Sequence, residues 1–176
     1  MSQVSDLLKT DKKESWHTKI FRVLMNLYPM FFGTGGRILF WSADWAEVHL
    51  RLKLNMWTRN YVKTIFGGSM FSATDPFYML MFLHILGKDF VVWDKSATIK
   101  FKKPAKKALY AIFKISPELL NKLKNEIQQN GETTHVALIQ WVDVDRVVYA
   151  ELERTIYMAS KDFYKQKLEK RKSTVS

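Results

Sequence analysis

The segment "TIFGGSMFSATDPFYMLMFLHILG" (Thr64–Gly87) constrains the fold of this chain more than any other part of the sequence. Its apolar residues leave no polar stripe at helical spacing, which predicts one helix of roughly 18–20 residues that is buried on most sides. The apolar run Pro76–Leu86 is too short to span a bilayer and contains His84, so a transmembrane helix is not expected. The rest of the chain must therefore surround this helix.

Alternating residue patterns on both sides of the segment predict β-strands. Val48, Leu50, Leu52 and Leu54 alternate with polar residues, which indicates a half-buried strand paired with Arg37–Trp41. Four more strands are predicted after Gly87, with a short helix between the second and the third. One antiparallel sheet curled around the apolar helix would bury every apolar face, which makes the chain a single α+β domain. The four strand segments are Phe90–Pro104, Ala108–Ser116, Glu132–Val144 and Arg146–Ser160, and the inserted helix is Ser116–Gly131.

The chain divides into four parts. Residues 1–14 read as a flexible tail, 15–36 as an N-terminal helix capped by Ser15 and stopped at Gly33–Gly36, 37–159 as the principal domain, and 160–176 as a basic helix or tail. No signal peptide is recognisable, so we expect a cytoplasmic protein. There is no cysteine and the four histidines show no ligand spacing, so neither a disulfide nor a metal site is expected.

The formal net charge of +11 is concentrated in two stretches. Ile99–Lys107 holds five lysines and no acid, and Lys161–Lys172 holds six basic residues against two acidic ones. Such runs are either solvated surface or contacts for a phosphate-bearing small molecule, an anionic lipid or nucleic acid. We expect no nucleic-acid partner, because the sequence contains no nucleic-acid-binding motif.

Two glycines, Gly67 and Gly68, stand where the apolar helix is predicted to begin. The first turn of a helix has backbone N–H groups without intrahelical partners, and the helix dipole there favours negative charge. With no side chains over these donors, a phosphate or a carbonyl oxygen that becomes negative during a reaction could approach them. The alternative is that the glycines only permit a tight turn or close packing.

Asp75 places a carboxylate within the apolar segment, directly before Pro76. Burial of a carboxylate is costly unless it is hydrogen-bonded, so Asp75 either performs a chemical task or bonds to local backbone groups. In a continuous helix Asp75 would share a face with Gly68 but lie roughly 10 Å further along the axis. We therefore predict that two antiparallel copies of the helix bring the glycines of one subunit against Asp75 of the other, in a site shared by a homodimer.

The pattern of Asn60, five residues, Phe66-Gly67-Gly68, six residues and Asp75 resembles the signature of hotdog-fold acyl-CoA thioesterases of the phenylacetate-degradation (PaaI-like) type. Those proteins usually have His where this chain has Phe66, and the segment is more similar to an uncharacterised branch of the superfamily with Phe at that position. The strand Ala97–Ala105 resembles the strand that follows the helix in the family. The resemblance covers about Arg37–Ala159, which would make residues 37–159 a hotdog domain.

This resemblance implies a hotdog fold: a curved antiparallel β-sheet wrapped around one long central helix, here with an extra N-terminal helix. It implies a homodimer that can pair into a tetramer. It also implies that Asp75 activates water or attacks the thioester carbonyl, that the N–H groups of Gly67 and Gly68 polarise this carbonyl, and that Asn60 orients the carbonyl or the water. Phe66 in place of His leaves open whether the chain catalyses the reaction.

For the substrate, we expect Lys100, Lys102 and Lys103 to contact phosphates of coenzyme A and Phe66 and Phe71 to contact the acyl part. Coenzyme A would be part of the substrate, and no separate cofactor is expected. The alternatives are that the lysines are only solvated and that Phe71 is ordinary core.

Three functions remain open. The first is hydrolysis of an acyl-CoA thioester, and the second is binding of acyl-CoA or a fatty acyl group without catalysis. The third is a peripheral membrane or assembly protein that uses the aromatic and basic N-terminal helix. We expect that helix to pack over the sheet or a partner subunit instead of a membrane surface.

Overall fold

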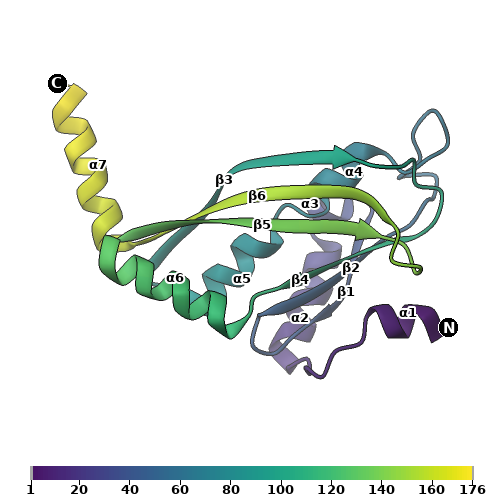
Figure 1. Cartoon of the computed structure of the whole chain (residues 1–176), viewed down its shortest axis with the longest axis horizontal. Coiled ribbons are helices and arrows are strands. Elements are labelled where there is room, and N and C mark those ends of the chain that lie inside the picture. Colours follow the sequence, from purple (N-terminus) through teal and green to yellow (C-terminus); the bar gives the residue numbers. More distant parts are fainter. Residues whose placement is uncertain (1, 176) are drawn as a thin grey trace.

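The computed structural model describes residues 2–175, and six strands in it form one antiparallel sheet. The spatial order is β1-β2-β4-β5-β6-β3, and the sheet lies against the central helices (Figure 1). The predicted α+β class and the six strands are therefore confirmed. The strands are β1 (Gly36–Trp41), β2 (Glu47–Leu52), β3 (Phe90–Phe101), β4 (Leu109–Lys114), β5 (Glu132–Val142) and β6 (Val148–Ser160).

Seven helices occur in the described residues, and two of them begin as the sequence predicts. The Ser15 side chain accepts a hydrogen bond from the Thr18 N–H at the start of α2, and Ser116 does the same for Leu119 at the start of α6. Gly131 ends α6 in the left-handed conformation, which glycine adopts without strain. The helices are α1 (Ser2–Leu7), α2 (Trp16–Leu27), α3 (Pro29–Phe32), α4 (Gly67–Ser72), α5 (Phe77–Leu86), α6 (Pro117–Asn130) and α7 (Lys161–Val175).

The central helix is interrupted, in contrast to the single long helix that the sequence predicts. It consists of α4 and α5, and residues 73–76 form a corner between them. At this corner the Thr74 N–H donates to the Phe71 carbonyl (3.2 Å) and the Asp75 N–H to that of Ser72 (3.1 Å). Pro76 has no N–H group, and its ring disfavours helical geometry at the preceding residue, so the first helix cannot continue. Asp75 therefore lies at a corner and not on the continuation of the Gly68 face.

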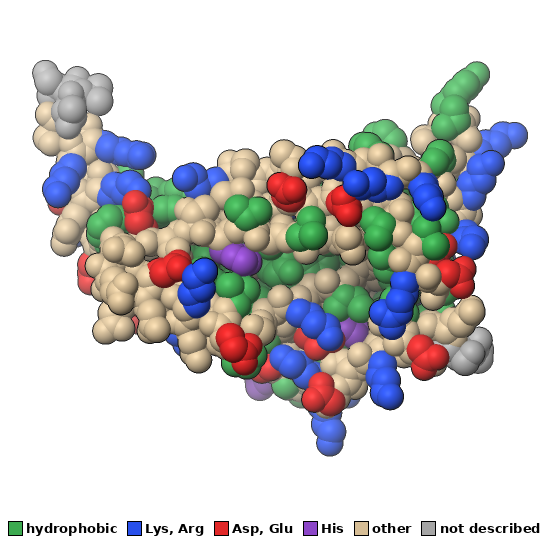
Figure 2. Space-filling model, in the orientation of Figure 1, with side chains coloured by type: hydrophobic (Ala, Val, Ile, Leu, Met, Phe, Trp, Pro, Cys, Tyr) green, Lys and Arg blue, Asp and Glu red, His purple; other side chains and the backbone are tan. Residues whose placement is uncertain are grey.

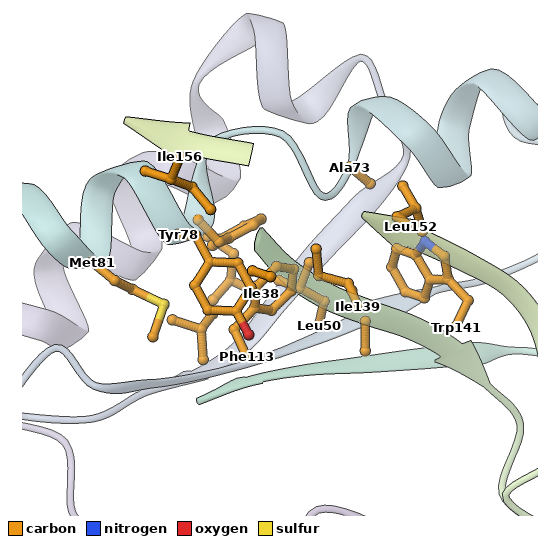
Figure 3. Packing of buried hydrophobic residues seen from close by; sticks show 14 of the residues in the cluster. Ile38, Leu50, Ala73, Tyr78, Met81, Phe113, Ile139, Trp141, Leu152 and Ile156 are labelled. Atoms are coloured by element: carbon orange, nitrogen blue, oxygen red, sulfur yellow. The ribbon is translucent and has the colours of Figure 1, made fainter. Parts of the chain in front are cut away.

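The hydrophobic core fills the space between the sheet and α5. Tyr78 and Met81 of α5 point toward Phe113 of β4 and Ile139 of β5 (Figure 3). These four side chains are buried, and burial of a side chain of this size contributes roughly 1.5–3 kcal/mol. Figure 2 shows a hollow below β5 whose floor carries further hydrophobic side chains.

Strand β2 is buried on both faces, although its alternating sequence predicts only one buried face. Glu47 and His49 are as buried as the apolar residues between them. The Thr10 hydroxyl donates to a Glu47 carboxylate oxygen (3.1 Å), and the ring of Phe40 lies against that of His49. The second face is covered because these polar groups find partners outside β2.

The N-terminal segment contacts the β1–β2 hairpin, whereas the sequence predicts a flexible tail over residues 1–14. The Ala43 N–H donates to the Lys13 carbonyl (2.8 Å), and the Glu14 carboxylate accepts from the Trp41 N–H (3.1 Å). Residues 10–14 thus pair with polar groups at this end of the sheet. Farther along, Pro29 divides the predicted N-terminal helix into α2 and α3.

Candidate active site

Gly67, the first residue of α4, borders a cavity of about 380 Å³, whereas Gly68 is not part of its lining. The cavity lies between the β2–α4 loop, the first turn of α4 and the end of β3. A hydrogen bond from the Ile65 N–H to the Ala105 carbonyl (2.8 Å) connects the loop with the segment after β3. The cavity is lined by Asn60, Val62, Thr64, Ile65, Gly67, Met70, Phe101, Lys102, Lys103, Pro104 and Ala105.

Both glycines allow aromatic rings to approach the backbone. A Cβ atom on Gly67 would lie 2.6 Å from Cζ of Phe101, and one on Gly68 would lie 2.2 Å from Cε1 of Phe66. Phe66 occupies the N-cap position without forming a side-chain cap, so no side chain of that residue binds the N–H groups of the first turn. The two rings are each 56% exposed. The start of α4 is therefore flanked by two exposed aromatic side chains and not by a capping polar group.

Asn60 fixes the loop that precedes α4. Its Nδ2 donates to Oγ1 of Thr64 (2.9 Å), and its Oδ1 accepts from the Thr64 N–H (2.9 Å). Both polar atoms of the amide are thus engaged within the loop, although the residue lines the cavity. This arrangement shapes the wall of the cavity next to Gly67.

Asp75 lies at the α4–α5 corner, where its carboxylate meets Arg154 of β6. The Arg154 guanidinium donates from Nη1 to Oδ1 of Asp75 (2.9 Å) and to Oδ2 of Asp94 (3.0 Å). Its Nη2 donates to the Phe71 carbonyl and to Oγ1 of Thr74, both at 3.2 Å. The side chain of Arg154 is 1% exposed, whereas that of Asp75 is 65% exposed. Asp75 is therefore held by a buried cation while one side of its carboxylate faces solvent.

Asp94 is the less exposed carboxylate of this network, with 21% of its side chain exposed. Burial raises its pKa, the Arg154 guanidinium lowers the pKa, and the negative charge of Asp75 raises it again, with a net increase. A single guanidinium thus serves two carboxylates in different environments. The arrangement fixes the corner residue Asp75 in place because Arg154 itself is packed in the core.

Arg154 and Asp94 are absent from the sequence-based candidates. The sequence of β6 contains a signal for Arg154, because every second residue of this strand faces the core. Arg154 lies on that inward face together with the buried residues Ala150, Leu152, Ile156 and Met158. An arginine in the inward register of a strand requires a buried acidic partner. Asp94 gives no comparable signal, because it precedes a register shift between residues 94 and 96.

The candidate residues line two different cavities in the single chain. Asn60, Gly67, Lys102 and Lys103 border the cavity at the start of α4. Asp75 instead borders a second cavity of about 300 Å³. The lining of this second cavity comes from α2, α3 and the end of α4, and consists of Met25, Tyr28, Met30, Phe31, Thr34, Phe71, Ser72, Asp75 and Pro76.

The three candidate lysines differ in their contacts. Lys102 forms an ion pair with Glu151 (2.7 Å), and the charge of Lys100 also acts on that carboxylate, whose pKa is lowered first of all by the hydrogen bond from Lys102. Lys103 lines the cavity and contacts the Tyr149 carbonyl through its backbone N–H (3.2 Å). Phe71 contacts Arg154, whose guanidinium carbon lies 5.2 Å from the ring centre.

Residues 2–175 contain neither a cluster of metal-ligating side chains nor a membrane-spanning helix. His, Asp and Glu side chains do not gather there in groups of three or more that could hold a metal ion. None of the helices in this range has both the length and the apolar character needed to cross a membrane.

The sequence of residues 17–158 matches a domain of unknown function, DUF4442. The chain belongs to the DUF4442 family. Among curated proteins, none matches the DUF4442 chain significantly.

Solved structures similar to the DUF4442 chain include several thioesterases. A Pseudomonas aeruginosa protein described as a probable thioesterase superposes with a TM-score of 0.70 at 20% identity, over 81% of this chain and 95% of that one. A thioesterase from Haemophilus influenzae superposes with a TM-score of 0.60 at 10% identity, over 86% of this chain and 96% of that one. Thioesterase superfamily member 2 from Mus musculus superposes with a TM-score of 0.59 at 14% identity, over 81% of this chain and 98% of that one. At these identities the likeness establishes the fold alone, which is the hotdog fold that the sequence resemblance implies.

Proposed function

We propose that this protein hydrolyses acyl-CoA thioesters in a site shared by two copies of the chain. The observation that carries the proposal is the cavity at the start of α4, where the backbone N–H of Gly67 lies in a first helical turn without a side-chain cap. Donors of this kind stabilise the negative charge that develops on a thioester carbonyl oxygen. The similarity to thioesterases of the same fold supports this choice of reaction.

Asp75 would act from the second copy. Within one chain it borders a different cavity from Gly67, so a single copy does not provide both the donors and the carboxylate in one place. Strand β3 lies at one end of the sheet, and an edge strand of this length can pair with the β3 of a second copy. A twofold arrangement of this kind would create two equivalent sites.

In the proposed reaction, one oxygen of the Asp75 carboxylate takes a proton from water, the resulting hydroxide attacks the thioester carbonyl carbon, and the C–S bond breaks as the proton passes to the sulfur of coenzyme A. If the carboxylate instead attacks the carbonyl carbon directly, the C–S bond breaks to give an Asp75 anhydride, and water then hydrolyses this anhydride to the free acid while its proton converts the thiolate to the thiol. The Arg154 guanidinium occupies Oδ1, which leaves Oδ2 for this step. Lys103 at the rim of the glycine cavity would contact a phosphate of coenzyme A.

Release of free thiol from a panel of acyl-CoAs of different chain lengths tests the proposal. We expect turnover by the wild type, a loss of at least about 100-fold in kcat for Asp75→Asn, and no change for Asp89→Asn, an exposed carboxylate outside both cavities. Background rates for every chain length, or full activity of Asp75→Asn, would remove the proposal.

Complementation tests the shared site. Gly67→Val fills the donor side of the cavity, and Asp75→Asn removes the carboxylate. If each site uses one residue from each copy, mixed dimers of these two inactive variants contain one intact site, and random mixing recovers about a quarter of the wild-type rate. Activity that stays absent after subunit exchange would show that both residues act within one chain.

A second candidate is binding of acyl-CoA without hydrolysis. Phe66 in place of the usual His and the ion pair between Asp75 and Arg154 favour it, because Arg154 already occupies one oxygen of the carboxylate. Calorimetry would then give acyl-CoA binding that Asp75→Asn leaves intact, with no thiol released.

A further inference from the structure

The N-terminal helix pair exposes an apolar surface that the rest of the described chain does not cover. Trp16, Ile20, Val23, Leu24 and Leu27 follow one another at helical spacing on α2, and all five are exposed. The opposite side of α2 packs on the body, where the Phe21 ring meets those of Trp41 and Trp45. One face of the N-terminal helix therefore packs over the body of the chain, as expected, and the other face is exposed.

Two neighbouring segments extend this surface. On α3 and just before it, Tyr28, Met30 and Phe32 are exposed. In the β2–α4 loop, Trp57 is 92% exposed. We call this surface the apolar face. It comprises Trp16, Ile20, Val23, Leu24, Leu27, Tyr28, Met30, Phe32 and Trp57.

A cavity of about 560 Å³ joins the helical part of this face to the loop part. Leu27 and Phe32 line it from α2 and α3, and Trp57 lines it from the loop. Its polar lining includes Arg37, Arg51 and Lys53, and these cations form no ion pair or side-chain hydrogen bond within residues 2–175. The cavity thus combines apolar walls with three unpaired positive charges.

The two arginines of this cavity stand directly opposite each other in the sheet. The β1–β2 register pairs Arg37 with Arg51, and side chains of residues paired in this way lie on the same side of the sheet. Like charges at such positions are destabilising. An anion bound between the guanidinium groups would remove the repulsion and gain two charge-assisted hydrogen bonds.

Acidic residues are missing from the sequence that builds this region. Residues 15–41 and 48–74 contain no Asp or Glu, whereas they contain the seven cations Lys19, Arg22, Arg37, Arg51, Lys53, Arg59 and Lys63. The segments that carry the apolar face are therefore uniformly basic, with Arg22 paired to Glu14. A surface of aromatic, aliphatic and basic side chains matches the interface of an anionic bilayer.

We propose that the apolar face binds the surface of an anionic membrane, with a lipid phosphate in the Arg37–Arg51–Lys53 cavity. Leu27, Phe32 and Trp57 at its walls, together with the α2 residues, enter the headgroup region. A second copy of the chain is a poorer occupant, because twofold pairing through this face would bring the unpaired cations of both copies together. The edge strand β3, at the other end of the sheet from β1, remains available for pairing.

Cosedimentation of the full chain with vesicles tests this proposal independently of catalysis. We expect binding to phosphatidylcholine vesicles that contain about 30% phosphatidylserine, little binding to phosphatidylcholine alone, and weaker binding as salt increases. Arg37→Gln/Arg51→Gln removes two charges near the surface, which predicts about 30-fold weaker partition. Leu27→Ser/Trp57→Ser should weaken binding to both vesicle types.

The matched control is Lys88→Gln/Lys124→Gln, which removes two exposed charges outside the basic segments and should bind like the wild type. Leu27→Ser/Trp57→Ser and the control replace exposed side chains and should keep the urea midpoint of the wild type, and Arg37→Gln/Arg51→Gln, which relieves the like-charge repulsion, should not lower it. Three results would overturn the proposal: wild type that stays in the supernatant, an equal loss of binding in the control, or equal binding to neutral and anionic vesicles. A smaller oligomer in Leu27→Ser/Trp57→Ser, without a change in vesicle binding, would instead assign the face to contact between copies.

Discussion

Substitution of Arg154 by methionine tests whether the buried guanidinium stabilises the α4–α5 corner. Methionine keeps most of the apolar packing of the arginine stem but leaves Asp75 and Asp94 without their cation. Removing one partner of a buried ion pair costs about 3–5 kcal/mol. Asp75 can be hydrated because its side chain is 65% exposed, so most of the remaining cost comes from Asp94, which is 21% exposed. We expect a loss of about 2–3 kcal/mol in the free energy of unfolding at neutral pH.

The same substitution should make stability more dependent on pH. In the wild type, burial raises the pKa of Asp94 and Arg154 lowers it, so loss of Arg154 moves this pKa further upward. A carboxyl with a raised pKa binds its proton more tightly in the folded than in the unfolded state. Stability therefore falls as pH rises from the unfolded value of 3.8 through the folded pKa. The deficit of Arg154→Met should thus be smaller at about pH 5 than at about pH 7.5.

Urea unfolding followed by tryptophan fluorescence measures both effects. Asp94→Asn/Arg154→Met should recover about 1–2 kcal/mol relative to Arg154→Met, because the buried carboxylate is then neutral at all pH values. The control Asp75→Asn/Arg154→Met should recover less, since Asp75 is solvated. A deficit that is equal at both pH values, or equal recovery by the two double variants, would refute this account of the network.

Three further predictions concern stability. Burial lowers the pKa of His49, so the unfolded state binds a proton more readily than the folded state, and stability should fall as pH drops below 6.5. In urea unfolding, His49→Gln should make the midpoint less dependent on pH in this range. The pH dependence that is left comes from His135, whose pKa burial also lowers. Gly131→Ala should cost more than about 1 kcal/mol in thermal unfolding, because φ is +79° and the new Cβ would lie 2.1 Å from Cδ2 of Phe163. Ser116→Ala should cost about 1 kcal/mol by removing the cap of α6, and an unchanged melting temperature would contradict this role.

Much of the fold could be predicted because its signals are local. Local sequence patterns, with clear alternation in two segments, located all six strands, and the cap at Ser15 and the stop at Gly131 located helix boundaries that the structure confirms. Backbone conformation near such residues depends on their own side chains and immediate neighbours. The resemblance around Gly67 and Gly68 added the hotdog topology, which the similar solved structures confirm.

The sequence did not reveal which charged groups meet. Arg154 lies 79 residues from Asp75 and 60 from Asp94, so their contact exists only after β6 has packed against β3 and the helix corner. In the same way, the sequence of β2 places Glu47 and His49 on its solvent-facing side, and only the folded structure shows that Thr10 and Phe40 cover them. The interruption of the central helix at residues 73–76 could be predicted only in part. Pro76 indicates that the helix is disturbed, but the sequence does not show how many residues the break includes.

The sequence by itself determined the strands, the helix caps, the apolar central segment and the basic, acid-free stretches 15–41 and 48–74. The tertiary structure decided that Gly67 and Asp75 border different cavities, and that the apolar side of α2 meets Arg37 and Arg51 at one surface. The physical reason is that local patterns fix the conformation of a segment, whereas burial and charge pairing depend on which distant segments fill the space around it.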